Sequence, residues 1–269
     1  MFLKNIFVYP IKSMKGTAVS EASVEERGLQ YDRRWMLVDS KNRFISQREE
    51  PTLALLSVTV ANDGLLVTSP TKGQMPVPFR PVDGRAERVE VWGSICDAQV
   101  VSREIDDWFS ELLGESYRLV QMAPEARRPV PPAYAVKDES VSFADEFPFM
   151  LVSEGSVEEL NRRLNVPVNV NRFRPNFVVS GAQPFAEDEW NAVSIGSTSF
   201  HGVKSCGRCV MTTIDQETGV KAGPEPLKTL AGFRERNGSV LFGRNLIAAE
   251  IGGIVRVGDP VVATAVKAL

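Results

Sequence analysis

Sulfur and imidazole ligands are scarce in this sequence, which has three cysteines and one histidine among 269 residues. A closed structural zinc site takes four ligands, so it would have to use every one of them: Cys96, His201, Cys206 and Cys209. Iron–sulfur clusters are generally held by four cysteines, more than the chain has. The odd number of cysteines also argues against a disulfide framework, and we expect a protein of the reducing cytoplasm.

The chain also lacks long hydrophobic runs and a surplus of either charge. Its N-terminal apolar stretch, MFLKNIFVYPIK, is too short for the core of a signal peptide, and no run approaches membrane-spanning length. The formal net charge is −3, so nothing attracts the chain in bulk to nucleic acid or to anionic lipid. We therefore expect neither a nucleic acid nor a membrane as a partner.

Short strands dominate the sequence pattern, and helices are few. The segments 53–60 and 65–68 are joined by Ala-Asn-Asp-Gly and predict a β-hairpin. One helix is predicted from an N-cap at Ser102 to Gly114, because apolar residues recur along one face. Shorter helices are predicted at a capping box that begins at Ser156 and over 226–233. The pattern predicts a mainly β fold with small helices (α+β) and a barrel-like or sandwich core.

Residues 123–140, APEARRPVPPAYAVKDES, are rich in proline and charge and show no periodicity. Such a stretch is either a connection between domains or a loop over a site. We expect a β-rich domain over 1–122, whose first strands could join the main core, and a second domain over 141–269. Arg127 and Arg128 in the connection are expected to be solvated.

The motif that could carry chemistry is Cys206-Gly207-Arg208-Cys209. The β-branched run that follows Cys209 predicts a strand, whereas a thioredoxin-like site needs its first cysteine at the start of a helix. Two interpretations remain open. The cysteines are either small buried residues of a strand, or one of them is a thiolate ligand to a metal whose other ligands come from a cofactor.

Several cationic and amide side chains stand at the ends of predicted strands: Lys12, Arg33, Arg174, Asn176 and Arg208. Guanidinium groups suit phosphate, and an asparagine amide can pair with the edge of a heterocycle. A soft metal carried by an anionic organic cofactor would account for both the thiolate and the cations. Each of these residues could also be an ordinary surface residue, because sequence spacing does not show that they converge.

Seven segments together resemble the MOSC-domain proteins, in the branch that contains the mitochondrial amidoxime-reducing component and bacterial reductases of N-hydroxylated bases. They run through nearly the whole chain in family order. The segments begin at Tyr9 (YPIKS), Asp32 (DRRW), Gln47 (QREEP), Asn171 (NRFRPN), Cys206 (CGRC, with Thr212 and Thr213), Phe242 (FGRN) and Gly258 (GDPV). The Cys-x-Arg-Cys and Arg-Pro-Asn segments are the specific ones.

The resemblance implies a MOSC-type β-barrel core with an N-terminal MOSC β-rich domain, and a bound molybdenum cofactor (Mo-molybdopterin). Cys209 would ligate the molybdenum and be the catalytic residue, with Arg208 beside it easing the thiolate charge. The pterin and its phosphate would be held by Lys12, Ser13, Arg33, Arg174, Asn176 and Arg208. Gly207, where relatives often have serine, would contribute only its backbone N–H. Cys206 would be a neighbour, Cys96 a core residue and His201 structural.

The implied activity is reduction of small N-hydroxylated compounds: hydroxylamines, amidoximes and N-hydroxylated purines would become amines, amidines and bases. Some relatives carry a ferredoxin domain with a C-x₄-C-x₂-C segment, which this sequence lacks. We therefore expect a separate electron donor, such as a ferredoxin, a flavodoxin or a cytochrome b5-like protein with its reductase. Two alternatives remain: a carrier or sulfur-transfer protein for the cofactor, or a non-catalytic β-domain with an incidental cysteine pair.

Overall fold

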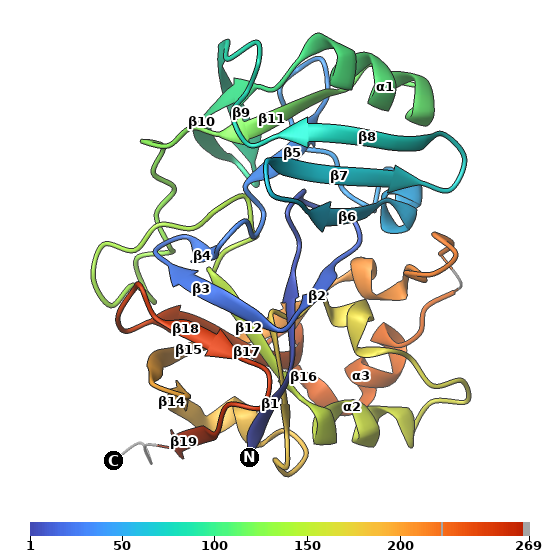
Figure 1. Cartoon of the computed structure of the whole chain (residues 1–269). Helices are drawn as coiled ribbons and strands as arrows, with labels where there is room; N and C mark the ends of the chain where they lie inside the picture. Colours follow the sequence, from blue (N-terminus) through green and yellow to red (C-terminus); the bar gives the residue numbers. More distant parts are fainter. Residues whose placement is uncertain (222, 266–269) are drawn as a thin grey trace.

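A nine-stranded sheet forms the lower part of the molecule in Figure 1 and takes strands from both ends of the chain. The computed structural model describes residues 1–221 and 223–265. The strand order is β19-β14-β15-β17-β12-β13-β1-β2, with β16 paired to β17. These strands are β1 (Phe2–Val8), β2 (Thr17–Val19), β12 (Phe149–Ser153), β13 (Phe177–Ser180), β14 (Trp190–Ile195), β15 (Thr198–Arg208), β16 (Glu235–Arg236), β17 (Ser239–Ala248) and β19 (Val261–Ala265).

The large sheet does not close on itself. Its path ends at β2 on one side and β19 on the other, and no ladder joins these two strands within the described residues. An isolated bridge between Phe2 and Pro260 is an additional contact between segments near its ends. The prediction of a mainly β fold with small helices is confirmed, whereas the barrel is not found as a closed ring of paired strands.

The upper part of the molecule in Figure 1 contains two smaller sheets and a helix. The strand orders of these two sheets are β5-β11-β10-β9 and β6-β7-β8. A third small sheet, in addition to these two, has the order β18-β3-β4. The strands are β3 (Glu21–Glu25), β4 (Gly28–Leu29), β5 (Trp35–Val38), β6 (Ser57–Val60), β7 (Gly64–Ser69), β8 (Gly73–Pro78), β9 (Ala86–Val91), β10 (Ser94–Val100), β11 (Arg118–Met122) and β18 (Ile254–Arg256).

Local signals explain the helix of the upper part. Helix α1 (Arg103–Leu113) begins after Ser102, whose hydroxyl accepts from the Ile105 amide, and ends at Gly114 in the left-handed conformation. The predicted helix is therefore confirmed. The predicted hairpin is confirmed over β6 and β7, but 51–55 form a 3-10 helix, η1 (Pro51–Leu55), because Glu50 caps it and Pro51 begins it.

The helices of the lower part are α2 (Glu154–Asn161) and α3 (Leu227–Arg234), together with the 3-10 helices η2 (Val170–Phe173), η3 (Ala186–Glu189) and η4 (Val210–Thr213). The cap of α2 is Ser153, whose hydroxyl accepts from the Ser156 amide, so the predicted cap at Ser156 is wrong by three residues. The buried Glu187 carboxylate accepts from both of these serine hydroxyls and fixes the helix start. None of the helices among the described residues is long and apolar enough to cross a membrane.

Strand order brings three chain segments to one edge of the large sheet. Strand β1 is antiparallel to β13, and β13 is parallel to β12, so the end of β1 lies beside the starts of the other two. A register shift between Leu3 and Asn5 keeps Ile6 and Val8 on the buried face of β1 up to its last residue. The chain leaving β1 at Tyr9 therefore meets the chain entering β12 and β13.

The proline-rich stretch 123–140 crosses between the two parts without a regular helix or strand. Arg127 is 54% exposed, as expected. Arg128 is buried, so the prediction that it is solvated is wrong. Its guanidinium donates to the backbone carbonyls of Ser142, Ala144 and Asp145, which satisfies the buried charge with neutral acceptors and fixes the chain that leads into β12.

Candidate functional site

The thiol of Cys209 is exposed where strand β15 ends and η4 begins. The hydroxyls of Thr212 and Thr213 donate to the carbonyls of Cys209 and Val210 at 3.0 and 2.7 Å. These bonds favour a tight turn over an extended chain, so the strand predicted after Cys209 is wrong. The strand lies before the thiol, and the thiol stands on a turn that its own threonines close.

Arg48 is the cation that contacts this thiol. Its Nη2 lies 3.0 Å from the Sγ of Cys209, and its guanidinium carbon lies 4.4 Å from the ring centroid of Trp92. No carboxylate pairs with Arg48 among the described residues. The sequence placed Arg48 in a family-like segment but gave no sign that it reaches Cys209. A guanidinium in contact with a sulfur can offset the negative charge of a metal-bound thiolate.

A buried lysine meets an exposed carboxylate next to this pair. Lys12 Nζ donates to Asp145 at 2.6 Å and to the Phe143 carbonyl at 2.8 Å, and Trp92 Nε1 donates to the same carboxylate oxygen at 2.9 Å. The Lys12 side chain is 7% exposed and that of Asp145 is 70% exposed. Solvent therefore reaches this ion pair from the side of Asp145.

Burial and pairing shift the pKa values of this pair in opposite ways. Loss of hydration lowers the pKa of Lys12 to about 8, although the charge and hydrogen bond of Asp145 act against it. Desolvation alone would raise the pKa of Asp145, but Lys12, the Trp92 hydrogen bond and Arg33 together hold it well below its usual range. Asp145 is thus an anion at neutral pH, and Lys12 is a cation that can lose its proton in mildly alkaline solution.

Two arginines enclose the ring of Tyr9. The guanidinium carbons of Arg33 and Arg174 lie 4.2 and 4.3 Å from the ring centroid. Arg33 pairs with the buried Asp32 at 2.6 Å, whereas Arg174 donates at 2.8 Å to the neutral carbonyl of Met14. Loss of hydration lowers the pKa of Arg174 to about 10, and burial raises the pKa of Tyr9 to about 12. At neutral pH the ring stays neutral, and Arg174 makes no ion pair with a carboxylate in the part of the chain that the structure describes.

Asn176 and Arg208 lie at the site with their polar groups already in use. The Asn176 side chain accepts from the Met150 amide at 3.2 Å and from Arg33 at 3.4 Å, and it donates to the Phe7 carbonyl at 3.2 Å. It therefore joins β1 to β12 and orients Arg33. Its predicted contact with a cofactor stays a prediction.

The guanidinium of Arg208 binds backbone carbonyls and a thioether sulfur. Nε and Nη1 donate to the carbonyls of Phe242 and Phe173 at 2.8 and 3.0 Å, and Nη2 lies 3.3 Å from the sulfur of Met150. Among the described residues Arg48 is the cation that contacts Cys209, so the expectation that Arg208 eases the charge of that thiolate stays a prediction. Arg208 adds positive charge near Tyr9 while it fixes the end of β15.

Ser13 and Gly207 are the remaining predicted site residues. Ser13 is buried, and its hydroxyl has no hydrogen-bond partner among the described residues. Gly207 is exposed, and a Cβ added there would meet no atom within 4 Å. Ser13 can therefore donate to an added ligand, and the surroundings of Gly207 would also admit a serine.

Strained backbone gathers at the same place. Ser13, Arg33, Trp92 and Arg174 have φ between 50 and 71°, and they are four of the eight non-glycine residues with positive φ in the described chain. Each such residue costs of order 1–3 kcal/mol and persists only where its surroundings demand it. The sequence does not indicate these positive φ angles. Glycine and asparagine are the residues that commonly adopt them, and none of the four is either.

The other scarce residues lie outside the cluster of polar contacts. Cys96 is a core residue, as predicted, and burial raises the pKa of its thiol. Cys206 packs against an apolar cluster that includes Phe242, and burial raises the pKa of its thiol as well. His201 lies within β15, opposite Ile247. Within residues 1–221 and 223–265 no group of three or more His, Cys, Asp or Glu side chains could hold a metal ion. Any metal here would need ligands from elsewhere.

The charges and free donors of this cluster fit an anionic ligand that carries a soft metal. Among the described residues, the ion pairs of five cationic side chains involve two carboxylates, Asp32 and Asp145; the cations are Lys12, Arg33, Arg48, Arg174 and Arg208. Uncompensated positive charge inside a protein is costly unless an anion offsets it. The Ser13 hydroxyl and the remaining N–H groups of Arg174 suit phosphate oxygens, and an exposed thiol suits a soft metal.

Comparison with known proteins assigns the family. The MOSC N-terminal beta barrel domain matches residues 1–116, and the MOSC domain matches residues 138–262. The chain therefore belongs to the MOSC-domain proteins. The two matched segments meet at the site, since Lys12, Arg33 and Arg48 lie in the first, and Arg174 and Cys209 lie in the second.

Within that family the chain is similar to the mitochondrial amidoxime-reducing components. It is 35% identical to component 1 of Mus musculus over 95% of this chain and 80% of that protein. It is 33% identical to component 1 of Homo sapiens over 95% of this chain and 81% of that protein. It is also 33% identical to the molybdenum cofactor sulfurase of Oryza sativa subsp. japonica, over 90% of this chain but 32% of that longer protein.

Proposed function

We propose that this protein reduces small N-hydroxylated compounds with a molybdenum cofactor bound through Cys209. The observation that carries the proposal is the exposed Cys209 thiol, which Arg48 contacts at 3.0 Å beside a partly buried group of cations whose ion pairs among the described residues involve two carboxylates, Asp32 and Asp145. A structural cysteine pair would need no such surroundings. A ligand with a metal at one end and a phosphate at the other would use both features.

The chain's own residues would divide the binding between them. Cys209 would hold the metal, and Arg48 would offset the charge of its thiolate. Arg174, Lys12 and Ser13 would bind the anionic part, while Tyr9 and Asn176 keep the two arginines in place. Gly207 would offer its backbone N–H, and Arg208 would stabilise the phosphate through its charge.

When bound, the cofactor would supply two-electron redox chemistry at a soft metal. The overall reaction balances as one hydroxylamine or amidoxime plus two electrons and two protons, giving one amine or amidine plus one water. Electrons would come from a separate donor protein. The names of the animal relatives, which speak of amidoxime reduction, support this substrate class.

The main rival function is transfer or sulfuration of the cofactor without substrate reduction, which the name of the rice relative keeps open. The deciding experiment uses protein purified from a host that makes molybdenum cofactor. With a chemically reduced viologen as electron donor, we expect reduction of an amidoxime to its amidine, loss of that activity in Cys209→Ala, and its retention in Cys206→Ala. Molybdenum-loaded protein that reduces no N-hydroxylated compound would instead favour the carrier function.

A further inference from the structure

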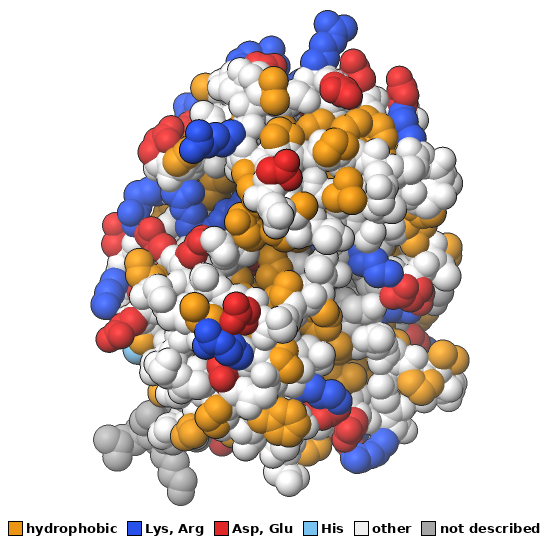
Figure 2. Space-filling view, in the orientation of Figure 1, with side chains coloured by type: hydrophobic (Ala, Val, Ile, Leu, Met, Phe, Trp, Pro, Cys, Tyr) orange, Lys and Arg blue, Asp and Glu red, His pale blue; other side chains and the backbone are white. Residues whose placement is uncertain are grey.

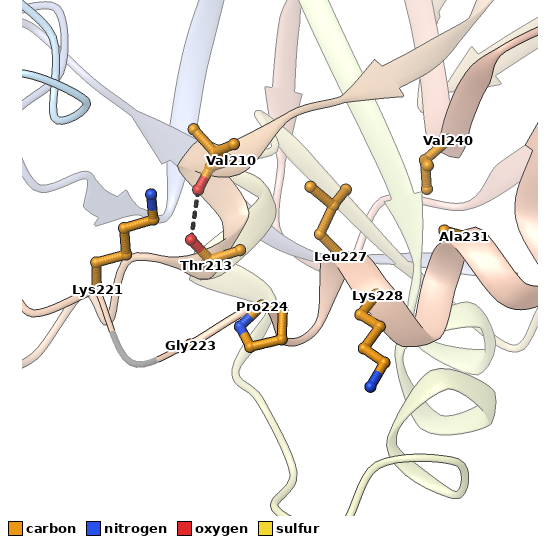
Figure 3. A pocket seen from close by; sticks show the side chains of 9 residues that line it. All are labelled: Val210, Thr213, Lys221, Gly223, Pro224, Leu227, Lys228, Ala231 and Val240. Carbon is orange, nitrogen blue, oxygen red and sulfur yellow. Dashed lines mark hydrogen bonds between the residues drawn. The ribbon is translucent and has the colours of Figure 1, made fainter.

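A cavity of about 600 Å³ opens beside the turn that carries Cys209. Its walls come from three elements: η4 contributes Val210 and Thr213, α3 contributes Leu227, Lys228 and Ala231, and β17 contributes Val240. Figure 3 shows Val210 and Thr213 facing Leu227 across the opening. A volume of this size lies within the range of roughly 300–1,000 Å³ that is typical of small-molecule sites.

Two of the lining residues tie the cavity to the proposed metal ligand. Val210 follows Cys209 directly, so their Cα atoms are about 3.8 Å apart. Val240 pairs with Arg208, the residue before Cys209, in the ladder between β15 and β17. The Thr213 hydroxyl, which donates to the Val210 carbonyl at 2.7 Å, makes the same turn rigid. The thiol and the cavity therefore share one fixed piece of backbone.

The walls of this cavity are apolar, and its margin is cationic. Val210 is 42% exposed although it is a large hydrophobic residue. Exposed apolar side chains that gather around a hollow typically mark a binding surface. Lys221 and Lys228 are exposed residues at the margin, and neither makes an ion pair with a described residue. In Figure 3 their ammonium groups lie on opposite sides of the opening, and that of Lys228 extends away from Leu227. Because no acidic side chain lines the cavity among the described residues, its surroundings favour an apolar body that ends in an anionic group.

We propose that this cavity binds the organic body of the substrate and selects aryl N-hydroxylated compounds that carry a carboxylate. The apolar ring would pack against Val210, Leu227 and Ala231, and the carboxylate would lie at the margin, where Lys221 on one side and Lys228 on the other supply positive charge. The N-hydroxyl group would then lie on the side of Cys209. This inference rests on the proposed function, since it names the substrate class of the same site.

The first test measures binding without turnover. The probe is 4-amidinobenzoate, the product expected from an aryl amidoxime with a para carboxylate, titrated into the purified holoprotein by NMR or calorimetry. Ala231→Phe fills the cavity from α3, and its matched control is Gly232→Phe on the same helix, where an added Cβ meets no atom within 4 Å. We expect Ala231→Phe to weaken binding by about tenfold or more, and the control to leave it unchanged.

The lysines are tested with a pair of ligands, benzamidine and 4-amidinobenzoate. Lys221→Ala and Lys228→Ala should each weaken binding of the carboxylate ligand by roughly two- to fivefold and leave the unsubstituted ligand unaffected, because exposed charges contribute little. Lys41→Ala, at an exposed position that does not line the cavity, is the control. Equal effects on both ligands would overturn the charge preference.

Turnover separates this inference from the proposed function. In Ala231→Phe the KM for the aryl amidoxime should rise, while kcat and KM for N-methylhydroxylamine, which is too small to need the cavity, should stay the same. Unchanged kinetics with the aryl amidoxime and unchanged binding of 4-amidinobenzoate in that variant would overturn the cavity as the substrate site.

Wild-type protein that binds 4-amidinobenzoate in the cavity but reduces neither compound would overturn the proposed function and leave the ligand site standing. If Ala231→Phe abolished binding of an electron-donor protein and left binding of the aryl ligand unchanged, the cavity would be a partner surface, and the inference would be overturned.

Discussion

The guanidinium of Arg48 lies 3.0 Å from the sulfur of Cys209, although 161 residues separate them in the chain. Arg48 belongs to the segment that matches the MOSC N-terminal domain, and Cys209 belongs to the MOSC domain. The contact means that each domain contributes one partner of a cation–sulfur pair. The cation can offset the negative charge of the sulfur when that sulfur binds a metal.

The contact predicts how fast the thiol reacts in cofactor-free protein. Arg48→Gln removes the charge, so alkylation of Cys209 by iodoacetamide at neutral pH should slow by roughly three- to tenfold. The alkylation rate of Arg48→Lys should lie between those of the wild type and Arg48→Gln, because lysine keeps the charge but lacks the planar group stacked on Trp92. The measurement follows the Cys209 peptide by mass spectrometry. Arg43→Gln, in an ion pair with Asp39, is the control, and an unchanged rate in Arg48→Gln would refute the role of Arg48.

Tyr9 should stabilise the site mainly through its ring. Tyr9→Phe keeps the ring between Arg33 and Arg174 but loses the hydrogen bond to the Pro175 carbonyl at 3.1 Å, so the free energy of unfolding should fall by about 1 kcal/mol. Tyr9→Leu also loses both cation–π contacts and should cost about 2–4 kcal/mol. Urea denaturation of the cofactor-free variants gives both values. Equal losses in the two variants would show that the ring contacts contribute nothing.

Lys12 should make anion binding depend on pH. Its folded pKa of about 8 lies below its ordinary value of 10.5, so the cost of burying its charge is fully present below about pH 8 and is relieved as pH rises towards the unfolded value. An anion needs the charged form. In cofactor-free protein, affinity for sulfate should therefore be constant below about pH 8 and fall above it, by at most about tenfold per pH unit.

Variants of Lys12 provide the control for that titration. Lys12→Met should bind sulfate more weakly and lose the decline above about pH 8, since no proton is left to lose at that position. Lys12→Arg should keep its affinity for sulfate above about pH 8 as well, because a guanidinium stays charged there. Calorimetric titrations from about pH 7 to pH 9 distinguish the three proteins. A wild-type affinity that does not change over this range would contradict the assignment of Lys12 to the anion site.

The predictable part of the fold was the part governed by neighbours in sequence. The Ser102 hydroxyl, the apolar stripe and Gly114 are enough to define α1, and the structure places the helix there. The same reasoning failed after Cys209, where β-branched residues suggested a strand. Thr212 and Thr213 carry hydroxyls as well as branched side chains, and their bonds to carbonyls three residues back favour a turn.

The candidate site was predictable as a set of residues but not as a set of contacts. The family-like segments pointed to Lys12, Arg33, Arg174 and Cys209, and the fold brings these segments together. The partners of those residues depend on packing between distant segments. Asp145 meets Lys12 because the stretch before β12 lies beside the end of β1, and Trp92 reaches both Asp145 and Arg48 from a turn between β9 and β10. No local pattern encodes such contacts.

The molybdenum and pterin content of wild type, Cys209→Ala and Cys206→Ala, each purified from a cofactor-competent host, tests directly whether Cys209 holds the cofactor. Because Cys209 is exposed and outside the core, its variant should fold and keep its circular dichroism spectrum. We predict about one molybdenum per chain in wild type and in Cys206→Ala, and loss of most of the metal in Cys209→Ala. Metal retained at the wild-type level in folded Cys209→Ala protein, or absent from the wild type, would contradict the claim that this sulfur holds the cofactor.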